Sequence, residues 1–224
     1  MKYAHDSMIV TVAPEEFKKI QNRLKFYDDQ FKAATTKDTE FAKLRDSQVV
    51  WIPSDDELYN IINPILPEVN KRAGWNLKID QVELFQYTKY EKGGFYNRHC
   101  DQHSGKLIDG KCRKISFTLW VNDEYTGGEL DLETKRPDDS PRYHSFKPKV
   151  GKAIFFLGTT WHGVRVIKSG TRKSLVGMEV HLMSNLVISK KSEVCLVPKA
   201  QWFCIVLHSP FLFVLFLPLQ FCIF

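Results

Sequence analysis

The sequence lacks the paired cysteines of a disulfide-bonded scaffold. It has five cysteines, an odd number, and no two of them form a CxxC pair. Small secreted domains that depend on disulfides usually carry an even number of cysteines. The cysteine content therefore favours a reducing compartment and argues against a disulfide framework.

The N-terminal residues also lack the charged and then apolar pattern of a secretory signal. Residues 1–6 are polar, and the apolar run at 9–12 is far shorter than a signal core. We therefore expect a cytoplasmic protein, unless its C-terminal segment anchors it in a membrane.

A strong excess of one charge is absent as well. The formal net charge is +6, and 43% of the residues are hydrophobic, which indicates a globular core rather than general disorder. The mild basic excess is compatible with nucleic acid, an anionic membrane surface, an acidic substrate or none of these. The length of 224 residues suits one domain, with or without an appendage.

Long apolar runs are missing from most of the chain, but residues 202–224 are almost wholly apolar. As a helix, these 23 residues would extend roughly 34 Å and could span a bilayer. Three lysines precede the run, as they would at a cytoplasmic face: Lys190, Lys191 and Lys199. Two prolines interrupt it, so an artefactual extension and a packed core segment are alternative interpretations. We treat residues 186–224 as a separate hydrophobic tail.

Two helical regions are predicted in residues 1–77. In the first, apolar residues recur at steps of three and four and define one helix face: Phe17, Ile20, Leu24, Tyr27 and Phe31. Pro14 suits the first turn of this helix.

The second helical region is predicted to begin at Ser54, which forms a capping-box pattern with Glu57. Pro64 and Pro67 should split this region, and Gly74 suits its end.

From residue 78 onward the pattern changes to short strands and turns. Residues 115–122 alternate between apolar and polar types, which predicts a half-buried strand. Further strands are predicted at 129–132, 152–157 and 174–182, with a loop at 137–141. Many short strands indicate a sandwich or barrel. We expect a β domain at residues 78–185 with residues 1–77 packed on it as a helical layer.

His99 and Asp101 form a candidate half-site for a metal ion. On a strand, residues two apart project to the same face, so one imidazole and one carboxylate could reach a single ion. Two histidines and one carboxylate leave three open positions in the coordination sphere of non-haem iron(II) oxygenases. A His-x-Asp pair is a weak signal by itself, and a third ligand would have to come from a distant strand.

The surrounding sequence resembles the prolyl 4-hydroxylase-like branch of the iron(II)/2-oxoglutarate dioxygenases. Residues 90–101 (YEKGGFYNRHCD) look like its metal-binding segment, which typically reads Y-x-x-G-x-x-Y-x-x-H-x-D. The resemblance extends over about residues 45–183, in family order, through these stretches: RKIS at 113–116, LWVN at 119–122, GGEL at 127–130, GKAIFF at 151–156, WHGV at 161–164 and GTRKSL at 170–175.

This resemblance implies an α+β, mainly β fold, a double-stranded β-helix or jelly roll with a supporting N-terminal helical layer. It also implies that His99, Asp101 and His162 bind iron(II). Arg172, ten residues beyond His162, would pair with the distal carboxylate of 2-oxoglutarate, which suits a planar guanidinium.

Two further residues are implied to contact the co-substrate. Tyr90 matches a family tyrosine whose hydroxyl reaches 2-oxoglutarate, although Tyr87 or Tyr96 could take that role. Trp120 stands where relatives often have a tyrosine or glutamine near the distal carboxylate, and core packing is the alternative role. His103, His144 and His181 have no matching motif, and we interpret them as structural or surface residues.

The implied reaction is hydroxylation of an unactivated C–H bond, with 2-oxoglutarate converted to succinate and CO2 and with ascorbate as a reductant. The substrate would be a prolyl or similar side chain of a peptide or protein, or a small molecule. A nucleic-acid demethylase of the same chemistry is disfavoured, because those enzymes usually carry a second arginine shortly after the first and residues 173–179 have none. A non-catalytic jelly-roll binding module is the other alternative.

Overall fold

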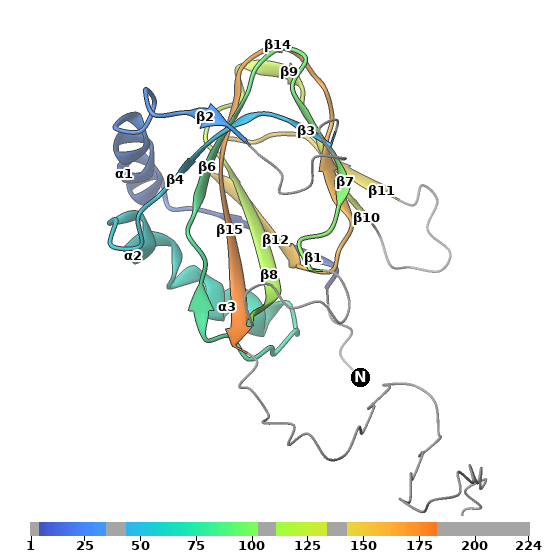
Figure 1. Cartoon of the computed structure of the whole chain (residues 1–224). Coiled ribbons are helices and arrows are strands. Elements are labelled where there is room, and N and C mark those ends of the chain that lie inside the picture. The colour runs from blue at the N-terminus through green and yellow to red at the C-terminus, as the bar shows by residue number, and fades with distance from the viewer. Residues whose placement is uncertain (1–4, 35–43, 103–110, 134–142, 183–224) are drawn as a thin grey trace, which may run out of the picture. The chain divides into compact units, whose positions relative to one another are not determined.

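The computed structural model of the chain describes residues 5–34, 44–102, 111–133 and 143–182, all within a unit that spans Met1–Met183 (Figure 1). These residues form two antiparallel sheets and a two-stranded ribbon, with three helices on the outside. The helices are α1 (Pro14–Lys25), α2 (Leu58–Ile62) and α3 (Ile65–Arg72).

The larger sheet has eight strands in the order β1-β12-β8-β15-β6-β4-β2, and β5 pairs with the far end of β15. Their bounds are β1 (Ser7–Thr11), β2 (Lys32–Ala33), β4 (Gln48–Trp51), β5 (Gln81–Val82), β6 (Gln86–Tyr90), β8 (Lys111–Trp120), β12 (Lys152–Leu157) and β15 (Arg172–Leu182). The long strands β8 and β15 pair along most of their length and form the centre of this sheet.

The smaller sheet has five strands in the order β11-β10-β13-β7-β3. Their bounds are β3 (Arg45–Asp46), β7 (Phe95–His99), β10 (Leu130–Glu133), β11 (Tyr143–Phe146) and β13 (His162–Val164). The separate ribbon pairs β9 (Tyr125–Gly127) with β14 (Ile167–Gly170). All of the pairings among the described strands are antiparallel.

The first predicted helix is confirmed, but it is shorter than its apolar pattern suggested. Phe17, Ile20 and Leu24 of α1 are buried, as the spacing predicted. The helix ends at Lys25, so Tyr27 and Phe31 lie beyond it, where Tyr27 is still buried in the same core.

The second helical region is split at Pro64, as predicted, whereas Pro67 lies within α3 and does not interrupt it. Pro64 is the N-cap residue of α3, and Gly74, with φ 75°, follows the C-cap residue in the left-handed conformation that ends many helices. The capping box at Ser54 was wrong. Instead, the carboxylate of buried Asp56 accepts the Leu58 amide (3.0 Å), so an aspartate satisfies a free N–H at the start of α2.

The strand predicted at 115–122 is buried on both faces, not one. Ile115, Phe117 and Leu119 pack with the helices in one hydrophobic cluster. Ser116 and Thr118, on the other face, are also buried, at 1% and 5% exposed. The polar alternation was therefore misleading, because the polar face of β8 points to an interior between the two sheets.

Residues 1–77 contribute strands as well as helices. β1 pairs with β12 and β4 pairs with β6, so this region extends the large sheet on both sides. The boundaries proposed at 77/78 and 185/186 stay predictions. The loop at 137–141, His103 and the tail at 186–224 lie outside the described residues. Within the described part of the chain, no helix combines the length and apolar character needed to cross a membrane.

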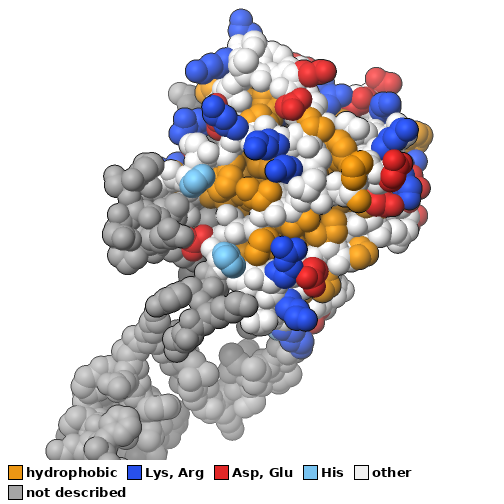
Figure 2. Space-filling view, turned by 180° about the vertical axis from the view of Figure 1, so that it is seen from behind, with side chains coloured by type: hydrophobic (Ala, Val, Ile, Leu, Met, Phe, Trp, Pro, Cys, Tyr) orange, Lys and Arg blue, Asp and Glu red, His pale blue; other side chains and the backbone are white. Residues whose placement is uncertain are grey.

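Lysine and arginine side chains occur in several small groups on the face seen in Figure 2, with acidic and hydrophobic side chains between them. On this face the two signs of charge are therefore interspersed.

Candidate metal centre

A small cavity lies between the two sheets. It has a volume of about 110 Å³, and both sheets contribute to its walls. Its lining includes Thr88 and Tyr90 of β6, Tyr96 and His99 of β7, Thr118 of β8, Phe156 of β12, His162 of β13 and Arg172 of β15, together with Asp101. A cavity of this size suits a small metabolite rather than a drug-sized ligand.

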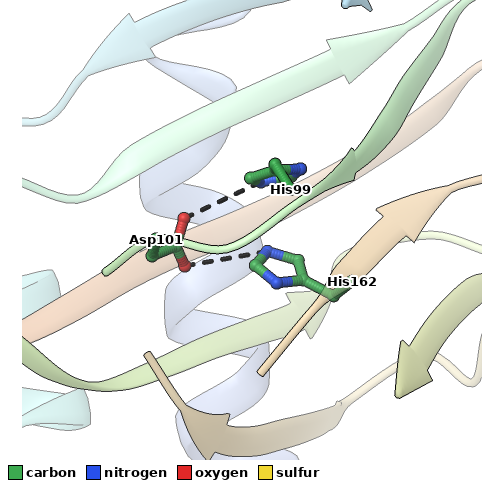
Figure 3. Close-up of side chains that lie close together, drawn as sticks. All are labelled: His99, Asp101 and His162. Carbon is green, nitrogen blue, oxygen red and sulfur yellow. Dashed lines mark ion pairs between the residues drawn. The ribbon is translucent and has the colours of Figure 1, made fainter. Parts of the chain in front are cut away.

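His99, Asp101 and His162 meet in this cavity (Figure 3). Asp101 Oδ1 lies 3.7 Å from His99 Nε2, and Asp101 Oδ2 lies 3.7 Å from His162 Nε2. One potential ligand atom from each residue lies within 4.8 Å of the others. The structure thus brings together the three residues that the sequence predicted as ligands.

The strands explain how the distant histidine reaches its partners. His99 ends β7 and His162 begins β13, and the two residues are direct partners in the antiparallel register. Directly opposed residues on neighbouring strands project to the same face. Asp101 follows His99 by two residues, so it returns to that face just after the strand ends.

Both imidazoles are held in an orientation that suits metal binding. His99 Nδ1 lies 2.9 Å from the carbonyl oxygen of Asn97, and His162 Nδ1 lies 2.9 Å from that of Thr160. We assign the proton to Nδ1 in each ring, because a carbonyl can only accept. The Nε2 lone pairs then point to the shared centre, as in many metal-binding histidines.

The electrostatics favour unprotonated forms of two of these side chains, His99 and Asp101. Burial lowers the pKa of His99 to about 4, and the nearby His162 acts in the same direction. For Asp101, burial alone would raise the pKa, but the two imidazoles and a hydrogen bond from Ser116 outweigh it, so the pKa is lowered. Neutral imidazoles and an ionised carboxylate are the forms that bind a divalent metal.

Two residues that support Asp101 were not identified as site residues from the sequence. The Ser116 hydroxyl donates to Asp101 Oδ2 (2.6 Å), and Arg113 Nη1 lies 3.4 Å from the Asp101 carbonyl oxygen. Arg113 is itself fixed by Glu83, with Nη2 2.7 Å from Oε2. Both belong to the stretch at 113–116, so the motif was the available signal, although it assigned them no role.

Arg172 lines the same cavity and is almost fully buried, at 1% exposed. Its Nη1 donates to Ser174 Oγ (2.8 Å), and Ser174 Oγ lies 2.7 Å from Thr88 Oγ1. The other edge of the guanidinium, Nε and Nη2, has no hydrogen-bond partner among the described residues. A buried cation with two free parallel donors matches a carboxylate, which can accept both.

The aromatic candidates separate into two groups. Tyr90 and Tyr96 both line the cavity. The centre of the Tyr90 ring lies 5.2 Å from Arg172 Cζ, and the Tyr96 ring stacks on that of His99 with ring centroids 3.6 Å apart. Tyr87 faces the helical core instead, where its hydroxyl donates to Asp28. Trp120 is buried in a hydrophobic cluster beside the cavity and is not among its described lining residues.

Two further histidines among the described residues, His144 and His181, lie apart from the three candidate ligands. His144 is exposed on β11 and packs against Phe146, and His181 pairs with Asp80 at the far end of β15. Both therefore fit the structural or surface role predicted for them.

The donor set fits a divalent first-row metal such as iron(II). Two imidazole nitrogens and one carboxylate oxygen can occupy one face of an octahedron, which leaves positions for exogenous ligands. Arg172 adds a carboxylate-binding group in the same cavity. The described residues thus combine a candidate metal centre with a neighbouring carboxylate-binding group in one cavity.

Comparison with known proteins shows which family part of the chain resembles. Residues 85–178 match the model of the 2OG-Fe(II) oxygenase superfamily. A PKHD-type hydroxylase of Acaryochloris marina is 34% identical over 98 residues, which cover 43% of this chain and 41% of the relative. A PKHD-type hydroxylase of Prochlorococcus marinus is 36% identical over 99 residues, with the same two coverages.

Solved structures of low sequence identity share the fold. A prolyl-4-hydroxylase of Pseudomonas putida superposes with a TM-score of 0.61 at 20% identity, covering 78% of this chain and 92% of that chain. A prolyl hydroxylase of Trichoplax adhaerens superposes with a TM-score of 0.62 at 16% identity, covering 78% and 83%.

Residues 85–178, less than half of the chain, are therefore similar to the 2OG-Fe(II) oxygenase superfamily and to the PKHD-type hydroxylases. The matched segment contains all three candidate ligands and Arg172. The chain spans about two fifths of the length of the PKHD-type hydroxylases that it matches.

Proposed function

We propose that this protein uses iron(II) and 2-oxoglutarate to hydroxylate an unactivated C–H bond in a peptide or protein, with a prolyl side chain as the expected target. The observation that carries the proposal is the pairing of two features in one cavity: the His99–Asp101–His162 cluster and the unpaired edge of the Arg172 guanidinium. When bound, iron(II) and 2-oxoglutarate supply the oxidising chemistry that places one oxygen atom of O2 in the substrate and releases succinate and CO2.

In this proposal His99, Asp101 and His162 hold the metal, and Arg172 holds the distal carboxylate of 2-oxoglutarate. Ser174 and Thr88 act through Arg172, because their hydrogen bonds fix the guanidinium edge that is already paired and so orient the free edge. Leu130, Phe156 and Val164 line the cavity between these groups. These apolar side chains exclude water and strengthen the charge interactions of the site.

A peptide substrate is supported by a second, larger cleft that adjoins the metal cavity. The cleft has a volume of about 780 Å³ and shares Tyr96 and Val164 with the cavity lining. It is also lined by Trp161, 41% exposed and next to His162, and by Arg98, whose guanidinium lies 3.5 Å from the centre of the Tyr143 ring. Aromatic walls are suited to proline-rich extended peptides. The related structure from Trichoplax adhaerens is a prolyl hydroxylase in complex with a peptide fragment.

We further infer that the two facing sheets form the double-stranded β-helix implied by the sequence resemblance. The position of the cavity between the sheets and the similarity to prolyl hydroxylase structures support this assignment.

The test is succinate release by the full chain supplied anaerobically with iron(II), then with 2-oxoglutarate, ascorbate and O2. We expect metal-dependent succinate from the wild type and its loss in His162→Ala and Arg172→Ala. Matched controls are His144→Ala and Arg72→Ala, which remove the same side-chain types from exposed positions outside the cavity. A proline-containing peptide library, read by a mass increase of one oxygen atom, then tests the substrate class.

Binding of 2-oxoglutarate is measured in parallel, because turnover without a peptide substrate is slow in a coupled oxygenase. Binding that is lost in Arg172→Ala but kept in Arg72→Ala supports the assignment of Arg172. A wild-type chain that folds but binds neither iron(II) nor 2-oxoglutarate would refute the proposal and favour the non-catalytic binding module.

A further inference from the structure

A buried carboxyl group without a partner lies on the opposite face of the large sheet from the metal cavity. Glu179 belongs to β15, where Met178 faces the metal cavity and Glu179 faces the helices. Glu179 is 1% exposed, and neither Oε1 nor Oε2 has a hydrogen-bond partner among the described residues. A buried carboxyl without a partner is costly, so its presence calls for an explanation.

Glu179 lines a cleft of about 600 Å³ between α2, α3 and β5. This volume lies within the range of small-molecule sites. Much of the wall is apolar and is formed by Leu66, Pro67, Leu77 and Ile79. The cleft therefore combines an apolar surface with one deeply placed acid, a combination typical of sites that orient a ligand by a single polar group.

The other polar side chains near the base of the cleft are already engaged. The Tyr59 hydroxyl donates to the Ile52 carbonyl oxygen (3.1 Å) and accepts the Phe85 amide (2.7 Å). The Asn70 side chain binds both the amide and the carbonyl group of Leu77 (3.0 and 2.8 Å). These groups stabilise the cleft walls, whereas the Glu179 oxygens, buried beneath the wall, have no hydrogen-bond partner among the described residues.

The charge of the lining favours a cation. The cleft contains two carboxyl residues, Asp80 and Glu179, and no lysine or arginine among its described lining residues. Asp80 is paired with His181. An acidic cleft is notable in a chain with a net charge of +6, since a basic protein would otherwise repel cations.

The state of Glu179 in the empty cleft agrees with this interpretation. Burial raises its pKa from an ordinary value of 4.5 to about 8, so that at neutral pH the carboxyl retains its proton. A ligand cation would replace that proton as the partner of the carboxylate.

We propose that the cleft between α2, α3 and β5 is a second ligand site, which binds a small organic cation. An ammonium or guanidinium group would pair with the Glu179 carboxylate, and its apolar part would pack on Leu66, Leu77 and Ile79. The site is separate from the metal centre, because β15 presents Met178 to one and Glu179 to the other.

The test uses benzylammonium as the probe and benzyl alcohol, which has nearly the same shape and no charge, as its control. Ligand-observed NMR on the full chain gives the affinity, and amide shifts of Gln81 and Val82 against those of Asn97 give the location. We expect a dissociation constant on the order of 1 mM for benzylammonium and binding at least about tenfold weaker for benzyl alcohol.

Two variants and a control define the site. Glu179→Gln keeps the shape and removes the charge, and should weaken benzylammonium at least about threefold. Asn63→Trp, at an exposed lining position, should block the cleft without disturbing the core. Glu68→Gln, on the exposed face of α3, removes one charge away from the lining and should leave the affinity unchanged.

The proposal is overturned by any of three results: equal affinity of Glu179→Gln and the wild type, equal affinity for benzyl alcohol and benzylammonium, or no saturable binding up to about 10 mM. Near-UV circular dichroism of each variant confirms that a lost signal does not come from loss of the fold.

Discussion

The buried carboxyl of Glu179 should make the stability of this protein fall as the pH rises from mildly acidic to neutral. In the folded chain its pKa is raised to about 8 by burial, against 4.5 for the ordinary group that the unfolded chain exposes. Between these values the folded state holds a proton that the unfolded state has lost. The free energy of unfolding therefore decreases with pH over this window, by up to about 1.4 kcal/mol per pH unit.

The magnitude follows from the two pKa values. Between pH 5.5 and 7.5, Glu179 alone should lower the free energy of unfolding by about 2.5 kcal/mol. Above pH 8 the loss levels off at about 5 kcal/mol, because both states are then ionised. Below pH 4.5 both states are protonated and the contribution disappears.

Urea denaturation of the wild type and Glu179→Gln at pH 5.5, 6.5 and 7.5 is the appropriate assay. A glutamine side chain does not titrate, so the difference between the two curves isolates Glu179 from every other titratable group of the chain. We expect the variant to gain stability relative to the wild type as the pH rises. Parallel curves, with a constant difference from pH 5.5 to 7.5, would show that Glu179 is not held in its protonated form and would refute the reasoning.

Three further predictions concern the core and the metal centre. Asp56→Ala removes a buried carboxylate that accepts the Leu58 amide, and should lower the free energy of unfolding by about 1–3 kcal/mol in chemical denaturation. Gly128→Ala should lower the free energy of unfolding by about 1–3 kcal/mol, because φ is 67° and an added Cβ would lie 3.1 Å from Arg172 Cδ. Because that Cβ would displace Arg172, isothermal titration should also show weaker 2-oxoglutarate binding by this variant. Manganese(II), a redox-stable substitute for iron(II), should stabilise the chain by about 2.7 kcal/mol at a hundredfold excess over its dissociation constant, and Asp101→Ala should abolish that gain in a thermal melt.

The candidate site was more predictable than the fold around it. His99 and Asp101 are two residues apart, so their common orientation follows from local geometry. The third ligand, His162, came from the family resemblance, because no local pattern reveals that β13 lies beside β7. Arg172 came from the same source, and the structure adds that one edge of its guanidinium has no hydrogen-bond partner among the described residues and can bind a carboxylate.

The strand pairings of the N-terminal region were not predictable in the same way. Ile9 pairs with Ile154, far along the chain, and five residues of β1 carry too little pattern to specify such a partner. The burial of Ser116 and Thr118 was missed for a related reason: alternation shows that a strand has two different faces, but not that the polar face is covered by a second sheet.

Glu179 illustrates the same limit of a sequence pattern. It is a single acidic residue in an apolar strand, and its lack of a hydrogen-bond partner becomes visible only when the surrounding chain is folded.

The pairing of β1 with β12 and of β4 with β6 has a consequence for how the protein can be divided. The segment that matches the family model begins at residue 85, after both of these N-terminal strands and all three helices. Cut at that point, the large sheet would present two open edges and an uncovered hydrophobic face, on which Phe117 and Leu175 now pack against the helical layer. Open edges and exposed apolar faces promote aggregation by strand pairing between molecules. We therefore expect the matched segment to depend for its solubility on the residues that precede it, β1 included.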